Sequence, residues 1–212
     1  MSRTGADTDH RLLAYVGHEL RNPLAAAMMN ISVVNEMVDE GDPRRPRLSQ
    51  ALADLERVSD LLTSLLAFGR VGVPELGPVD LAQVVRRVAE RVCPDMSRVT
   101  APTEPSFMQG DSRLLEQAVE NLMRNSVAAG ATMVEIMVDR EPGEVVLHIE
   151  DNGRGVPEDL GERIFDPMVS GRGSTGLGLA MAREIIESHG GSLTLLPTSS
   201  GALFRISLPG AG

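Results

Sequence analysis

Hydrophobic residues recur at helical spacing in the first part of the chain. One series runs in steps of three and four residues, which places its members on one side of an α-helix: Leu13, Val16, Leu20, Leu24, Ala27, Ile31, Val34 and Val38. A second series has the same spacing: Leu48, Leu52, Leu55, Val58, Leu62, Leu65 and Leu66. Gly and Pro residues interrupt the pattern between them, at 40–47. The pattern predicts an antiparallel helical hairpin.

A hairpin of two helices can bury only a small apolar core by itself. Pairing with a second copy into a four-helix bundle would bury the remaining apolar surface. We therefore expect residues 1–70 to form a dimerisation domain and the protein to be a homodimer.

Beyond residue 70 the pattern changes. Gly and Pro residues at 71–78 predict a linker. We expect the rest of the chain, residues 79–212, to form a second domain. In this part, helical periodicity and strand-like alternation follow one another. Helices are expected at 80–92, 112–129 and 177–188, and strands at 133–139, 145–151, 192–196 and 202–208. The fold class is therefore α+β, a helical bundle followed by an α/β layered domain with a ligand site on its loops.

Composition narrows the range of partners. Hydrophobic residues make up 42% and charged residues 24%, as in globular proteins, and the net charge of −10 argues against a nucleic-acid partner. All 20 basic residues are arginine, so a basic contact to phosphate has to come from Arg. The single Cys93 fits a reducing compartment, and no apolar run approaches the ~20 residues of a membrane span. These features predict a cytoplasmic chain without a membrane segment.

His18 is the first candidate for chemistry. Helical geometry places it opposite the apolar stripe, with Asn22 one turn further on and Glu19 at the flank. A partly neutral imidazole can act as a nucleophile, and a neighbouring carboxylate can accept its proton. The alternative is an ordinary solvated histidine. A zinc site of the His-Glu-x-x-His type does not fit, because Asn occupies position 22.

Asn121 and Asn125 lie four residues apart on a predicted helix, and hence on one face. Their amide oxygens suit Mg²⁺, an ion that keeps most of its ligands from phosphate and water. A pair of surface amides is the alternative.

Two glycine-containing segments complete the set. The sequence Asp-Asn-Gly-Arg-Gly, from Asp151 to Gly155, predicts a turn at the end of a strand. The Asp151 carboxylate can accept a hydrogen bond from an adenine amino group there. An ordinary Asn-Gly turn is the alternative. Gly171 to Gly178 opens onto a predicted helix, whose first N–H groups can bind phosphate. It is not a P-loop, because Gly-x-x-x-x-Gly-Lys is absent.

In this order the motifs resemble those of two-component sensor histidine kinases. His18-Glu-Leu-Arg-Asn-Pro-Leu24 is similar to the H box, 121–125 to the N box and 151–155 to the G1 box. Residues 164–167 resemble the F box and 173–178 the G2 box. The resemblance extends from about residue 12 to residue 208, nearly the whole chain.

The resemblance implies a phosphotransfer hairpin followed by a Bergerat-type ATP-binding α/β sandwich. His18 would accept the γ-phosphoryl group of ATP with help from Glu19, and pass it to an aspartate of a response regulator receiver domain. Asn22 suggests an additional phosphatase activity. Asn125 would hold Mg²⁺, Asp151 would bind adenine, and the segment from about Phe165 to Thr175 would be a mobile ATP lid. The remaining nucleotide-binding residues would be Asn121, Gly153, Gly155, Arg172, Ser174, Thr175, Gly176, Leu177 and Gly178.

Some positions depart from the family pattern. The family often has a Lys and an aromatic residue shortly after the second N-box Asn, whereas this chain has Ser126-Val-Ala-Ala129. Arg124 and Arg172 are candidates to replace the Lys. Met168 stands where the F box has a second aromatic residue. About seventeen residues precede His18, so the signal is expected either from a sensor domain outside this sequence or from a separate sensor protein.

Two other functions compete with the kinase. The first is a phosphotransfer adaptor that keeps His18 but does not hydrolyse ATP; the missing Lys favours it, and the retained Asn125 and Asp151 argue against it. The second is a Bergerat-fold serine kinase or ATPase whose helices only dimerise, which the exposed position expected for His18 disfavours.

Overall fold

The computed structural model describes residues 20, 22–68, 73–102, 104–169 and 176–210. By internal contacts the chain divides into two compact units, residues 1–70 and 71–212. None of the described helices is long and apolar enough to cross a bilayer.

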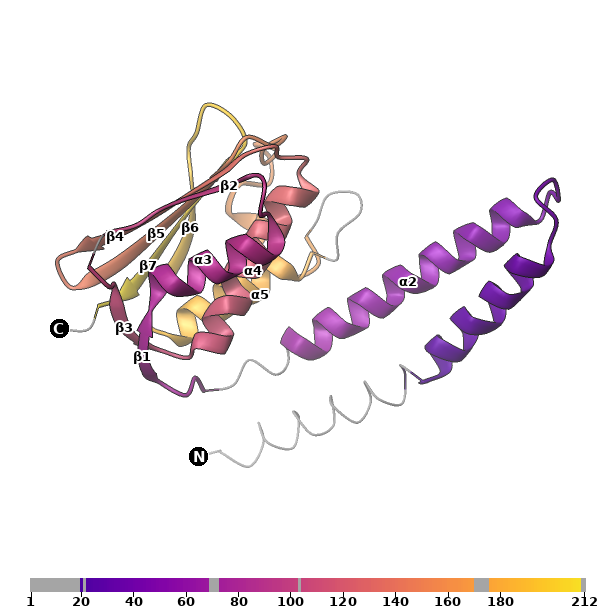
Figure 1. Ribbon diagram of the computed structural model, residues 1–212, viewed down its shortest axis with the longest axis horizontal. Coiled ribbons are helices and arrows are strands. Elements are labelled where there is room, and N and C mark those ends of the chain that lie inside the picture. The colour runs from indigo at the N-terminus through magenta and orange to yellow at the C-terminus, as the bar shows by residue number, and fades with distance from the viewer. Residues whose placement is uncertain (1–19, 21, 69–72, 103, 170–175, 211–212) are drawn as a thin grey trace. The chain divides into compact units, whose positions relative to one another are not determined.

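The first unit is a helical hairpin. Residues 22–37 form its first helix and Arg45–Phe68 form α2, and the two lie side by side and antiparallel (Figure 1). The helix break predicted at 40–47 is too long, because α2 already begins at Arg45. Pro46 fits the first turn of a helix, where its missing N–H has no intrahelical partner to lose.

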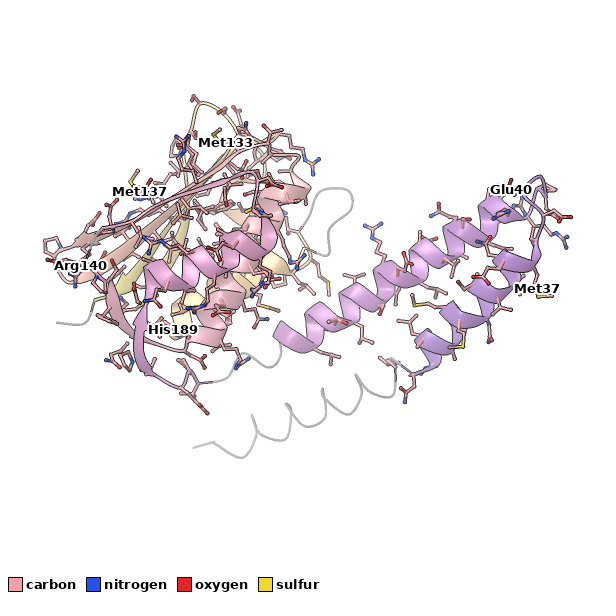
Figure 2. The ribbon with its side chains drawn as sticks, in the orientation of Figure 1. Met37, Glu40, Met133, Met137, Arg140 and His189 are labelled. Carbon is pink, nitrogen blue, oxygen red and sulfur yellow. The ribbon has the colours of Figure 1, made fainter. Side chains whose placement is uncertain are left out.

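Asp42 organises the turn before α2. Its carboxylate accepts hydrogen bonds from the Arg44 backbone N–H at 2.8 Å and from the Arg44 guanidinium at 2.6 Å. The hydrogen bond from the Arg44 side chain has the largest effect and the one from its backbone N–H the next largest, and together they lower the pKa of Asp42 to about 2. Glu40 and the exposed Met37 lie at this end of the hairpin (Figure 2).

The second unit is a two-layer α/β sandwich. Its main sheet has the order β2-β4-β5-β7-β6, in which only β2 runs parallel to its neighbour, β4. Its strands are β2 (Ser97–Thr100), β4 (Val134–Glu141), β5 (Glu144–Asp151), β6 (Ser192–Leu196) and β7 (Ala202–Pro209). A small antiparallel pair joins β1 (Gly77–Asp80) to β3 (Phe107–Gly110).

Three helices cover one face of the main sheet (Figure 1). They are α3 (Leu81–Val92), α4 (Ser112–Ala128) and α5 (Gly178–Ser188), and a short 3-10 helix, η1 (Gly161–Phe165), precedes α5. Their apolar sides pack on the inward side chains of the strands, whereas Met137 of β4 lies on the other, exposed face (Figure 2). The core is therefore the layer between the helices and the sheet.

The predicted helices and strands of this unit are confirmed, with ends shifted by one or two residues. The sequence pattern did not predict β1, β2, β3 and η1. Each of these strands has four residues, too few for alternation to be recognised. Gly77 and Pro78 belong to β1, although they were assigned to the linker.

Asp111 caps the N-terminus of α4, the helix that carries most of the candidate site. Its side chain accepts hydrogen bonds from the N–H groups of Arg113 and Leu114 at 3.0 and 3.2 Å. Burial raises the pKa of Asp111, but these bonds and one from the Glu75 N–H outweigh it, so the pKa lies below its usual value. This cap fixes the start of α4 relative to the chain that enters the domain.

Candidate functional site

Asp151, the last residue of β5, is the most buried charged residue of the site, with 2% of its surface exposed. Strand register places it between Val134 of β4 and Ala202 of β7. Its Oδ1 accepts hydrogen bonds from the N–H groups of Gly153 at 2.9 Å and Ala202 at 3.3 Å, and its Oδ2 accepts one from the Ser126 hydroxyl at 2.8 Å. Three donors thus hold a buried carboxylate in one orientation.

Glycines form the walls around Asp151. A Cβ on Gly153 would lie 3.0 Å from Asp151 Oδ1 and 2.9 Å from the Cβ of Ala129. Gly155 has φ +72, and a Cβ there would lie 2.8 Å from the carbonyl oxygen of Gly201. Gly201 has φ +65, and its Cβ would overlap the carbonyl oxygen of Asp151. Space beside the carboxylate therefore depends on three missing side chains.

Replacing Gly201 by alanine should lower the free energy of unfolding by about 2–4 kcal/mol, since a Cβ there both strains the backbone and overlaps Asp151. Gly143→Ala is the matched control: Gly143 has φ +81 but nothing within 4 Å of its Cβ, so it should lose only about 1 kcal/mol. Denaturant unfolding of both variants measures the difference. Equal losses would contradict the overlap.

The loop after Asp151 is fastened to the C-terminal end of α4. The Arg154 backbone N–H donates to the Ala129 carbonyl at 3.2 Å, and its guanidinium donates to the Ala128 carbonyl at 2.9 Å. Asn152 accepts hydrogen bonds from the N–H groups of Thr132 and Met133. The loop and the end of the helix therefore form one connected unit.

Asn121 and Asn125 lie one turn apart on α4, as predicted. Among the residues that the structure describes, none bonds the buried Nδ2 of Asn121. A Cβ on Gly178, the first residue of α5, would lie 3.9 Å from Asn121 Oδ1. The unsatisfied amide therefore lies beside a helix start, where backbone N–H groups favour an anion.

These features fit Mg-ATP. Asp151 can accept from an amino group, and the unpaired Asn121 amide beside Gly178 can donate to phosphate. Within the described ranges no group of three or more His, Cys, Asp and Glu residues could hold a metal ion. Mg²⁺ in proteins usually keeps most of its ligands from phosphate and water, and the Asn125 amide oxygen is the candidate protein ligand here.

Phe165, predicted to contact nucleotide, packs in the core with 3% of its surface exposed. Its ring meets Phe204 edge-on at 6.2 Å, and the Arg183 guanidinium lies 4.8 Å from its centroid. This packing anchors the chain where the predicted lid begins. Direct contact of Phe165 with nucleotide stays a prediction.

A backbone hydrogen bond runs from the N–H of Met168, within the predicted lid, to the carbonyl of Gly176, the residue after it, at 2.9 Å. Met168 has φ 66, rare for a side-chain-bearing residue, and Gly176 has φ +69 with no room for a Cβ beside Met168. Leu177 follows in the core, with 1% of its surface exposed.

Several predicted residues lie outside the described residues: His18, Glu19, Arg172, Ser174 and Thr175. Asn22 lies within them, exposed on the first helix of the hairpin. Their roles stay predictions.

Arg124 is a poor replacement for the missing Lys. It forms a 2.7 Å ion pair with Glu120, which also pairs with Arg91 of α3 at 2.8 Å. Burial raises the pKa of Glu120, but the hydrogen bonds and charges of Arg124 and Arg91 lower it below its usual value. Arg124 therefore lies on the side of α4 that faces α3, whereas Asn121 lies beside Gly178 of α5.

Sequence reasoning missed two residues of the site, Ser126 and Gly201. Ser126 directly follows the N-box Asn125. The segment that it begins was interpreted only as lacking the family's Lys, and the serine itself was given no role. Gly201 lies in the connection between β6 and β7, 50 residues from Asp151 along the sequence (201 − 151), and no local signal connects the two.

The fold and the site together are those of an ATP-binding domain, and the comparisons with known families agree. The histidine kinase-, DNA gyrase B- and HSP90-like ATPase family matches residues 110–212, and the His Kinase A phospho-acceptor domain matches residues 9–73. The chain is 32% identical to the probable sensor histidine kinase TcrY of Mycobacterium tuberculosis, over 94% of this chain and 45% of TcrY.

Solved structures agree. The mycobacterial sensor histidine kinase MprB is 30% identical, with a TM-score of 0.58 over 64% of this chain and 97% of that one. Full-length ShkA in complex with AMPPNP has the same fold, with a TM-score of 0.73 at 23% identity over 95% of this chain and 46% of that one. The chain belongs to the two-component sensor histidine kinases and comprises their phospho-acceptor and ATPase domains. It spans about half the length of TcrY.

Proposed function

We propose that this chain binds Mg-ATP, phosphorylates its own His18 and passes the phosphoryl group to an aspartate of a response regulator receiver domain. The observation that carries the proposal is the buried Asp151, which three hydrogen bonds hold in place. One of these bonds comes from Ser126 of α4, the helix that also carries the unpaired Asn121 amide. One group suits the base of ATP and the other suits its phosphates.

In the proposed reaction a ring nitrogen of His18 forms a bond to the γ-phosphorus while the bond from that phosphorus to the bridging oxygen breaks, and ADP leaves. Glu19 accepts the ring proton. A receiver aspartate then takes the phosphoryl group, which returns His18 to its free form. Bound Mg²⁺ would neutralise charge on the phosphates.

A homodimer through the hairpin is part of the proposal. Among the described residues of the first unit for which burial is given, only Leu66 is buried. Apolar side chains are left exposed along both helices, up to 80% for Met37: Leu20, Met29, Val33, Val34, Met37, Val58 and Leu65. Burying this surface in a four-helix bundle would supply the missing core.

Two features support a functional ATPase domain over a degenerate adaptor. The Asp151 cradle needs glycine at three positions, and Asn121 keeps an unsatisfied amide, which costs about 1–3 kcal/mol unless a ligand pairs with it. A domain that no longer binds nucleotide would gain stability by losing the unsatisfied amide.

We further propose the boundaries 1–70, 71–78 and 79–212 for the phosphotransfer domain, linker and catalytic domain. Gly77 and Pro78 already pair in β1, so the flexible part would end before them. The need for ATP places both domains in the cytoplasm. A separate sensor protein is a candidate source of the signal.

Incubation with γ-labelled ATP and Mg²⁺ tests the function. We expect the label to be lost in acid and kept in base, as for a nitrogen–phosphorus bond. A label stable to acid would indicate a serine or threonine kinase instead. Release of inorganic phosphate without labelling would indicate an ATPase, and neither event would indicate an adaptor.

Phosphatase activity is a separate part of the proposal. Asn22 is exposed on its helix and carries an amide that can orient an attacking water. Asn22→Ala should slow dephosphorylation of a phosphorylated receiver domain at least about tenfold while autophosphorylation continues. Asn30→Ala, also exposed on this helix, is the control. Normal dephosphorylation by Asn22→Ala would contradict the role.

A further inference from the structure

Ser126 is fully buried on α4, and its hydroxyl lies between two acceptors. Asp151 Oδ2 is 2.8 Å away and the Leu122 carbonyl oxygen is 3.4 Å away. A hydroxyl has one proton, and it goes to the nearer, charged acceptor because that bond is stronger. Ser126 is thus a side-chain donor to Asp151.

The hydrogen bonds of Asp151 leave little freedom to its carboxylate. A carboxylate offers about four acceptor positions. The Gly153 and Ala202 N–H groups take two on Oδ1, and Ser126 takes one on Oδ2. One position, on Oδ2, is therefore left for another donor.

We propose that Ser126 is a positioning residue that sets the preference of this site for adenine. Its hydroxyl holds the Asp151 carboxylate so that the single remaining acceptor position on Oδ2 is kept for the 6-amino group of the purine. The inference rests on the proposed role of Asp151 in nucleotide binding. It goes beyond that role, because it assigns the preference to a pair of residues.

The placement of Ser126 on α4 gives this hydrogen bond a second consequence. Ser126 directly follows Asn125 and is five residues from Asn121, about 7.5 Å along the helix axis. The bond therefore ties the carboxylate at the base end to the helix that carries the amides at the phosphate end. Adenine and phosphates are thus positioned from one rigid element.

Purine discrimination follows from the charge of the acceptor. Adenine presents an amino donor at position 6, whereas hypoxanthine presents an oxygen, which a carboxylate repels. A site whose polar groups are left unpaired by the wrong ligand discriminates strongly. Without the Ser126 hydroxyl, the carboxylate gains a second open acceptor position and loses one of its three restraints, so the discrimination should weaken.

The test measures dissociation constants of ADP and inosine diphosphate by calorimetry, with Mg²⁺ and the full chain. Inosine diphosphate has an oxygen in place of the 6-amino group. Ser126→Ala should weaken ADP binding about fivefold and leave inosine diphosphate binding nearly unchanged, so the ratio of the two constants falls. A merely structural role would weaken both nucleotides equally.

Two further variants complete the design. Ser126→Cys keeps the shape of the side chain but donates weakly, so its ratio should fall as in Ser126→Ala even if the alanine variant folds poorly. Ser106→Ala is the matched control, because Ser106 is equally buried and its Oγ has no partner among the described residues. It should leave the ratio unchanged.

An unchanged ratio in both Ser126 variants would overturn the inference. Asp151→Asn separates that outcome from failure of the proposed function. If Asp151→Asn weakens ADP binding while the Ser126 variants keep the wild-type ratio, only the role of Ser126 is wrong. If Asp151→Asn binds ADP as the wild type does, the adenine role of Asp151 is wrong, and the inference falls with it.

Discussion

Replacing His18 by alanine is expected to abolish labelling of the chain by γ-labelled ATP while ATP affinity stays at the wild-type value. The imidazole is the proposed nucleophile, and alanine has no atom that can bond to phosphorus. The described residues proposed to bind nucleotide all belong to the second unit, whereas His18 is proposed only as the phosphate acceptor, so the substitution should leave ATP affinity unchanged. Acid-labile label is measured on the denatured chain, and ATP affinity by calorimetry.

His10→Ala is the matched control for this experiment, because it removes another histidine from the same part of the chain. It should keep the label. Glu19→Gln should slow labelling without stopping it, since the proton acceptor is lost but the nucleophile remains. Acid-labile label that persists in His18→Ala would show that another residue is phosphorylated.

Asp151→Asn is expected to weaken ATP binding by about 10- to 100-fold, the range for loss of a hydrogen bond to a charged group. The amide oxygen can still accept from the Gly153 and Ala202 N–H groups. The amide nitrogen then takes the place of Oδ2 and meets the adenine amino group donor to donor. The Ser126 hydroxyl can turn and accept from that nitrogen, so the domain should stay folded.

Inosine diphosphate makes the same variant more informative. Its 6-oxygen can accept from the new amide, so Asp151→Asn should bind it at least as tightly as the wild type does. Thermal unfolding without nucleotide checks the fold. Unchanged ATP affinity in a folded Asp151→Asn variant would show that Asp151 does not contact the base.

The sequence predicted the long elements and the order of the motifs well. The periodicity of α4, α5, β4, β5, β6 and β7 is strong because each has one face in the core. The pairing of Asn121 with Asn125 followed from helix geometry alone. Four-residue strands such as β2 and β3 were missed because they are too short to show a period.

The directions of single side chains depend on contacts that the sequence does not show. Arg124 was a candidate for phosphate contact, but its neighbour Glu120 bonds both Arg124 and Arg91 of α3. Phe165 was predicted to contact nucleotide, which stays a prediction; its ring meets Phe204, which is distant in sequence. In both cases a contact between separate elements decided the direction of the side chain.

The sequence by itself determined which residues are candidates for the chemistry: a histidine, a pair of helix amides, an acidic residue at a strand end and a glycine-rich approach to a helix. Local spacing and residue type carry that information. Only the tertiary structure decided how Asp151 is held, because Ser126, Gly153 and Ala202 come from three segments. Sheet register and helix packing bring them together, and neither can be read from any one segment.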